Sequence, residues 1–99
     1  MKIIDILNLL NTEKSITILT PNYIECKLVY DRIKLHATNI QLIDNNTLKI
    51  DDSKIIIVTP ETFCLDPTSK LIVEFPNSFP YSVLNKLWVS DIIYCSEIV

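Results

Sequence analysis

The most constraining feature of this chain is that its 99 residues include no glycine, although average usage of about 7 % would give roughly seven. Glycine is the residue that adopts positive φ at little cost and lets a backbone approach a ligand closely. The P-loop, the dinucleotide-binding G-x-G-x-x-G turn and the G-x-S-x-G nucleophile elbow all depend on it. The sequence therefore excludes these nucleotide-binding and hydrolase motifs.

The other biases in composition indicate where such a chain originates. Isoleucine occurs 17 times and asparagine and lysine eight times each, whereas arginine and alanine occur once each. Residues with A/T-rich codons are thus favoured over those with G/C-rich codons. We interpret this as the product of an AT-rich genome, as in many phages, archaeal viruses and mobile elements.

Length and hydropathy predict a single compact domain over residues 1–99. Hydrophobic residues make up 48 % of the chain and the mean hydropathy is +0.29, which is high for a soluble protein. No uncharged apolar stretch reaches the roughly 18 residues of a membrane span, and the N-terminus lacks a signal-peptide cleavage site. We therefore expect a cytoplasmic protein (host cytoplasm, if viral) with no membrane contact, whose surplus apolar surface meets a protein partner or a second copy as a homodimer.

Charge and cysteine content argue against several site classes. The net charge of −3 disfavours a general nucleic-acid binder, which must neutralise several phosphates. Cys26, Cys64 and Cys95 form no C-x-x-C pair, and His36 is the only histidine, so zinc spacing is absent and no metal or cofactor is expected. A Cys64–His36 hydrolase would need a third orienting group, which nothing in the sequence supplies. The expectation is a protein that is not an enzyme.

The pattern of apolar residues predicts an α+β fold, with a mostly antiparallel sheet of five to seven strands and a helix near each end of the chain. The two helices are predicted from apolar stripes, the first over Ile3, Ile6, Leu7 and Leu10, and the second over Phe79, Val83, Leu84, Leu87 and Trp88. Strands are predicted over 15–20, 23–30, 32–37, 40–43, 48–50, 54–59, 71–75 and 92–94, with a hairpin turn over 44–47 in which asparagine supplies positive φ.

One predicted strand differs from the others because its apolar residues do not alternate. The run from Ile55 to Val58 needs burial on both faces, which is typical of a central strand. Two helices of this size cover one face of a sheet, so the second face needs another cover. Either the sheet closes into a sandwich or barrel, or a second copy supplies the cover as a C₂ dimer.

A basic cluster forms the first candidate site. Tyr23, Lys27, Arg32, Lys34 and His36 are predicted to lie on the outward face of neighbouring strands, where they could contact nucleic acid or an acidic partner. The simpler interpretation is a solvated strand face, with Glu25 as the cross-strand ion-pair partner.

Late aromatic residues form the second candidate site. Phe79, Tyr81, Trp88 and Tyr94 are of the types that anchor protein interfaces, and Tyr81 lies off the main helical stripe and is expected to be exposed. The simpler interpretation is that the helix packs this stripe on its own sheet.

These features favour a small non-enzymatic protein–protein interaction module, such as an accessory or host-factor-antagonist protein of a virus or mobile element. The alternative is a nucleic-acid-associated regulator that uses the basic strand face.

Overall fold

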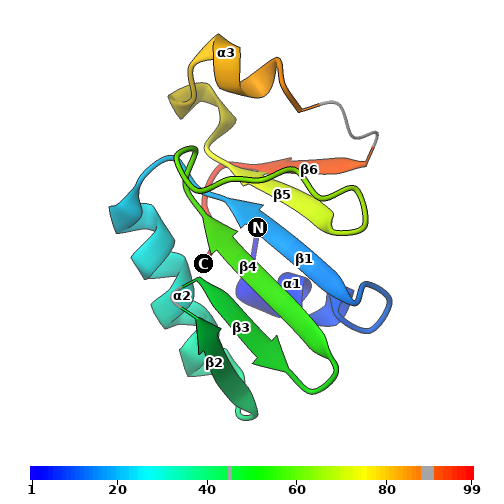
Figure 1. Ribbon diagram of the computed structural model, residues 1–99. Coiled ribbons are helices and arrows are strands. Elements are labelled where there is room, and N and C mark those ends of the chain that lie inside the picture. The colour runs from blue at the N-terminus through cyan, green and yellow to red at the C-terminus, as the bar shows by residue number, and fades with distance from the viewer. Residues whose placement is uncertain (45, 88–90) are drawn as a thin grey trace.

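The computed structural model describes residues 1–44, 46–87 and 91–99. Its described part forms one six-stranded sheet in the order β2-β3-β4-β1-β5-β6, with helices packed on it (Figure 1). In chain order the elements are α1 (Ile3–Leu9), β1 (Ser15–Leu19), α2 (Tyr23–His36), β2 (Ile40–Asp44), β3 (Thr47–Ile50), β4 (Ser53–Val58), β5 (Lys70–Glu74), the 3₁₀ turn η1 (Pro76–Ser78), α3 (Tyr81–Leu84) and β6 (Ile92–Cys95). The α+β class is confirmed.

The sheet is mixed, so the prediction of a mostly antiparallel sheet is wrong. Among the described strands, β1 pairs in parallel with both β4 and β5, and β5 pairs in parallel with β6. Only the β2–β3 and β3–β4 pairs are antiparallel. Parallel neighbours need a long crossover connection, and the segment from α2 to β3 supplies the connection between β1 and β4.

The predicted strands over 23–30 and 32–37 are in fact the single helix α2. Asn22 caps this helix, because its side-chain oxygen accepts a 3.0 Å hydrogen bond from the backbone N–H of Glu25. Val29 and Ile33, one turn apart, are its fully buried residues. The apparent alternation arose because α2 carries apolar side chains on more than one side, which also satisfies a period of two over a short window.

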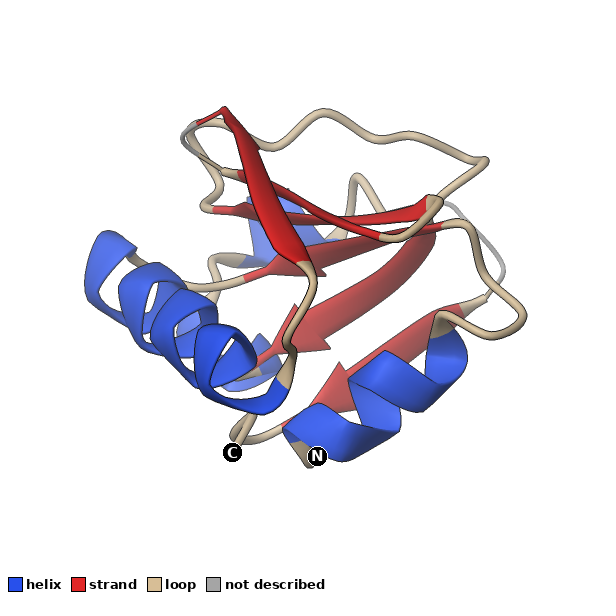
Figure 2. Cartoon of the chain, turned by 90° about the horizontal axis from the view of Figure 1, so that it is seen from below, coloured by secondary structure: helices blue, strands red, loops and turns tan. Residues whose placement is uncertain are grey.

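The main core lies between one face of the sheet and the helices α1 and α2, which both cover that face (Figures 1 and 2). The predicted N-terminal helix is therefore confirmed. The isoleucines of β1 and β4 that point to this face are completely or almost completely buried. The buried members of this first core are Ile3, Ile6, Ile16, Ile18, Val29, Ile33, Leu48, Ile55, Ile57, Ile72 and Ile98.

The second face of the sheet carries its own apolar cluster, formed by Leu19, Val58, Leu71, Val73 and Phe79. Burial of β4 on both faces is thus confirmed, and β4 is an interior strand. The cover is neither a second sheet nor a second copy. Apolar residues of the loop after β4 and of the segment around α3 pack against this second core, namely Phe63, Leu65, Val83, Leu84 and Leu87.

Three hydroxyl groups form a buried polar link on the same face. The Ser69 Oγ lies 2.8 Å from both the Ser15 Oγ and the Thr17 Oγ1, and all three side chains are buried. Each hydroxyl therefore has a partner, as buried polar groups require. The link joins the start of β1 to the residue before β5.

The predicted C-terminal helix is much shorter than its apolar stripe. It spans Tyr81–Leu84, between Pro80 as N-cap and Asn85 as C-cap. Phe79 precedes it, and Trp88 lies outside the described residues. The apolar side chains of this segment cover the sheet from an irregular backbone, which a helical period does not anticipate.

Without glycine, two other residues take up left-handed backbone in the described part of the chain: Asp51, with φ 54°, and Phe75, with φ 53°. Asp51 and Asp52 form the two-residue connection between β3 and β4, a loop type that favours positive φ. The predicted β2–β3 hairpin is confirmed, although Asn45 lies outside the described residues. No described helix is long and apolar enough to cross a bilayer.

Candidate interaction surface

The outer side of α2 carries three large aliphatic side chains in a row. Ile24, Leu28 and Leu35 are 71 %, 39 % and 82 % exposed. At 100° per residue they fall within about 40° of one another around the helix, far from the buried side of Val29 and Ile33. We call Ile24, Leu28 and Leu35 the outer stripe.

Such a stripe is unusual on a helix that faces solvent. A helix on a protein surface normally carries polar residues opposite its buried side, and one that is apolar on all sides is normally buried. Single exposed apolar residues are common, but here three of them are aligned along about three turns. The outer stripe is therefore the clearest candidate for a contact with another molecule.

A row of charged and aromatic residues borders the outer stripe. Lys27 forms an exposed ion pair with Asp31, with 3.6 Å between Nζ and Oδ1. The ammonium groups of Lys27 and Lys34 lie 6.0 and 5.2 Å from the centroid of the Tyr30 ring, within the range of cation–π attraction. This row gives the border of the outer stripe a partly positive character.

Beyond that row, a shallow hollow of about 150 Å³ separates α2 from the β2–β3 hairpin. Tyr23, Cys26 and Tyr30 line it from the helix, and Leu42 lines it from the edge strand β2. Tyr23 is 74 % exposed and Leu42 is 56 % exposed. Exposed apolar surface is thus found on both sides of the Lys27–Tyr30–Lys34 row.

The structure does not contain the basic strand face that the sequence predicted. Because residues 23–36 are helical, Tyr23, Lys27 and Lys34 share one side of α2, whereas Arg32 and His36 lie elsewhere on it. The Arg32 guanidinium donates a 2.7 Å hydrogen bond to the carbonyl oxygen of Ile98.

The other residues predicted for this face are also placed differently. The Nδ1 of His36 lies 2.9 Å from the carbonyl oxygen of Arg32. The His36 ring lines a separate polar cavity of about 450 Å³ with Lys14, Asp51 and Asp52. Glu25 is not the ion-pair partner of the cluster. It occupies the first turn of α2, and Asp31 pairs with Lys27 instead.

The aromatic candidates are divided between core and surface. Phe79 is 7 % exposed and belongs to the second core, so it cannot anchor a partner in this conformation. Tyr81 is 80 % exposed, which confirms the expectation for this residue. Tyr94 is half exposed on the edge strand β6, and Trp88 lies outside the described residues.

The cysteines are not arranged for nucleophilic catalysis with histidine. Cys64 is exposed, but its neighbours Phe63 and Leu65 pack on the sheet face opposite the one that carries α2 and His36. Burial raises the pKa of the Cys26 and Cys95 thiols, which lowers their nucleophilicity at neutral pH. Within residues 1–44, 46–87 and 91–99, no three His, Cys, Asp or Glu side chains cluster as metal ligands would.

Sequence reasoning missed the outer stripe because it assigned strands to this segment. The signal that identifies the helix is Asn22 followed three residues later by Glu25, the spacing of a helix N-terminus. Once residues 23–36 are helical, the spacing of Ile24, Leu28 and Leu35 places them on one side.

No protein-family model matches the chain, and no curated protein or solved structure matches it either.

Proposed function

We propose that this protein is a non-enzymatic protein–protein interaction module that receives its partner on the outer stripe of α2. The observation that carries the proposal is the alignment of Ile24, Leu28 and Leu35 on the exposed side of the longest helix. The AT-biased composition supports an accessory or host-factor-antagonist role in a virus or mobile element.

The stripe favours an amphipathic helix as the docking segment of the partner. From Ile24 to Leu35 it extends about 17 Å at 1.5 Å per residue, and a helix of three to four turns presents apolar residues over the same length. Lys34, next to Leu35, has no ion-pair partner among the described carboxylates. An acidic residue near one end of the partner helix would complement this charge.

The energetics indicate that the partner also contacts residues beside the stripe. Complete burial of a large aliphatic side chain contributes about 1.5–3 kcal/mol, and these three are already partly covered. Association itself costs roughly 4–15 kcal/mol in lost freedom. The stripe therefore acts as an anchor, and Tyr23 at the start of the same helix is well placed to extend the contact.

The test is a selection of amphipathic helices from a displayed peptide library, followed by measurement of Kd for the selected peptides. Binding to the Ile24→Ser/Leu35→Ser variant should be at least about tenfold weaker than to the wild type, as loss of interface anchors implies. Leu42→Ser, which removes an exposed leucine from β2, is the matched control and should bind normally.

Two outcomes would contradict this proposal. Equal affinity of the wild type and the stripe variant would remove the outer stripe as the docking site. A wild-type dimer in light scattering that dissociates in the stripe variant would show that a second copy, rather than a partner helix, covers the stripe.

A further inference from the structure

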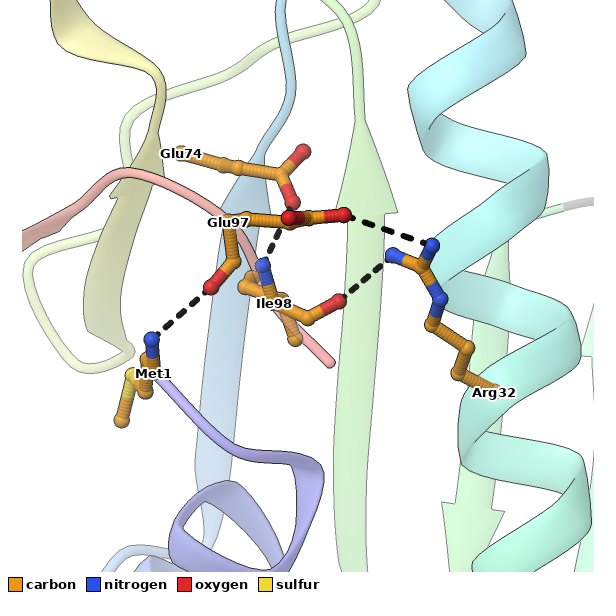
Figure 3. Close-up of polar contacts among 5 residues, drawn as sticks. All are labelled: Met1, Arg32, Glu74, Glu97 and Ile98. Carbon is orange, nitrogen blue, oxygen red and sulfur yellow. Dashed lines mark hydrogen bonds and ion pairs between the residues drawn. The ribbon is translucent and has the colours of Figure 1, made fainter.

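Glu74, the last residue of β5, is a fully buried carboxyl group with only one of its oxygens bonded. Its Oε2 accepts a 3.0 Å hydrogen bond from the backbone N–H of Ile98. Its Oε1 is buried and has no partner among the described residues. Figure 3 shows the carboxyl group above the segment that contains Ile98. A buried polar atom without a partner costs about 1–3 kcal/mol, and more when the group is charged.

The segment 96–99, which we call the strap, is attached to three parts of the molecule. Arg32 of α2 donates a 2.7 Å hydrogen bond to the Ile98 carbonyl, and its guanidinium lies 3.6 Å from the Glu97 carboxylate (Figure 3). The Met1 amino group donates to the Glu97 carbonyl at 2.8 Å. The backbone N–H of Val99 bonds the Met1 carbonyl. The Ile98 side chain is completely buried in the first core.

We propose that Glu74 is a protonation-controlled latch: its neutral carboxyl holds the strap closed against β5, and its ionisation favours local opening of the strap. A neutral carboxyl tolerates the dry site and can donate a hydrogen bond. An ionised carboxyl would leave a charged oxygen buried and unpaired. Opening of the strap admits water to that oxygen, so the charge is solvated only in the open form.

The groups around Glu74 do not cancel this effect. Burial raises the pKa of Glu74 from its ordinary 4.5 to about 7. The Ile98 N–H and the Arg32 guanidinium favour the ionised form, whereas the carboxylates of Glu25 on α2 and Glu97 on the strap oppose it. The remaining titratable groups nearby are the Cys26 thiol of α2 and the Cys95 thiol of β6.

The direction of the effect follows from proton linkage. The closed strap holds the Glu74 proton up to about pH 7, whereas a solvated carboxyl releases it near 4.5. Opening therefore becomes more favourable as the pH rises between these values and levels off above them. From pH 5.5 to pH 8 the opening equilibrium should increase roughly 30-fold.

Opening would also vacate the apolar site of Ile98. That site lies at the carboxyl end of the parallel strands, beside the point where the chain moves from β4 past β1 to β5. Open α/β sheets bind ligands at such a reversal of strand order. The latch would therefore control access to the position in this sheet where a ligand pocket is most expected.

The test is amide hydrogen exchange of Ile98 by NMR at pH 5.5 and pH 8, corrected for the intrinsic pH dependence of exchange. In the wild type, protection of Ile98 should fall roughly 30-fold, while protection of Ile16 in β1 changes much less. In Glu74→Gln, which cannot ionise, the change at Ile98 should disappear. Glu25→Gln removes a nearby carboxylate that does not touch the strap, and it should retain most of the change.

Three results would overturn the latch: unchanged Ile98 protection in the wild type, an equal loss at Ile16, or a full pH response in Glu74→Gln. If Glu74→Gln does not fold, the ¹³C resonance of the Glu74 carboxyl decides the matter in the wild type. A titration midpoint near 7 that coincides with the loss of Ile98 protection supports the latch, and a midpoint near 4.5 overturns it.

Discussion

Ile24 and Leu35 lie on the same side of α2, about three turns apart, and both are largely exposed, at 71 % and 82 %. They flank the half-exposed Leu28 on a helix whose opposite side is buried in the first core. An ordinary surface helix would place polar residues at these positions. This relationship separates two roles within one helix, because its inner side stabilises the fold while its outer side is free to contact a partner.

The first prediction tests that separation. The variant Ile24→Ser/Leu35→Ser should change the free energy of unfolding by less than about 1 kcal/mol, because substitutions at exposed positions have small effects. Ile33→Ser, on the buried side of the same helix, should lower it by about 3 kcal/mol or more, since it leaves a cavity and buries a hydroxyl. Urea unfolding measures both. A large loss of stability in the stripe variant would place these residues in the fold rather than on an interface.

The second prediction concerns the turn between β3 and β4. Asp51 has a φ of 54°, whereas its neighbour Asp52 does not have a positive φ. Asp51→Gly should raise the free energy of unfolding by roughly 0.5–1 kcal/mol because glycine adopts left-handed backbone without strain. Asp52→Gly should be neutral or destabilising by a similar amount, since it adds only freedom to the unfolded chain. The reverse order of the two variants in urea unfolding would contradict the turn geometry.

The third prediction concerns the buried hydroxyl link between Ser15, Thr17 and Ser69. Ser69→Ala should lower stability by about 1–3 kcal/mol because it leaves two buried hydroxyls without this partner. Replacing all three hydroxyls, as in Ser15→Ala/Thr17→Val/Ser69→Ala, should recover much of that loss, since no buried polar atom of the link then remains. Denaturant midpoints compare the two variants. A triple variant much less stable than the single one would contradict this account.

The fourth prediction is the pH dependence of global stability. The pKa of Glu74 is raised in the folded protein to about 7, so its contribution is fully present below 4.5 and is lost as the pH rises through 7. The pKa values of Asp44 and Asp66 are lowered, chiefly by hydrogen bonds from Asn46 and Thr68, respectively. Their contribution is present above about 3.8 and is lost as the pH falls.

The free energy of unfolding should therefore be highest at mildly acidic pH and lower at pH 8. Thermal or urea unfolding across pH 3–9 measures this profile. In Glu74→Gln the decline between pH 5 and 8 should be much smaller. A wild type that is most stable at pH 8 would contradict the assignment of Glu74.

The sequence predicted those parts of the fold that depend on local pattern. The β-branched run of β1, the non-alternating run of Ile55 to Val58 and the hairpin before it were all found in the structure. The residues from Tyr23 to Tyr30 satisfied both a strand and a helix pattern, and the Asn22 cap decides between them. Strand direction was not predictable, because it depends on how α2 and the β2–β3 hairpin return the chain.

The candidate sites show the same limit. The exposure of Tyr81 followed from its position off the apolar stripe, and the structure confirms it. The latch could not be found in this way. It joins Arg32, Glu74 and Ile98, which are widely separated in the chain and share no spacing pattern.

The position of β1 between β4 and β5 has a consequence for how the chain folds. β1 pairs Ile16 with Ile55 and Ile18 with Ile72, so its partners are synthesised long after it. On the ribosome, β1 must wait with its apolar residues unpaired until β4 and β5 have emerged. Such non-local pairing slows folding relative to helical proteins of this size, and it makes the newly made N-terminal half the stage at which chaperones would bind.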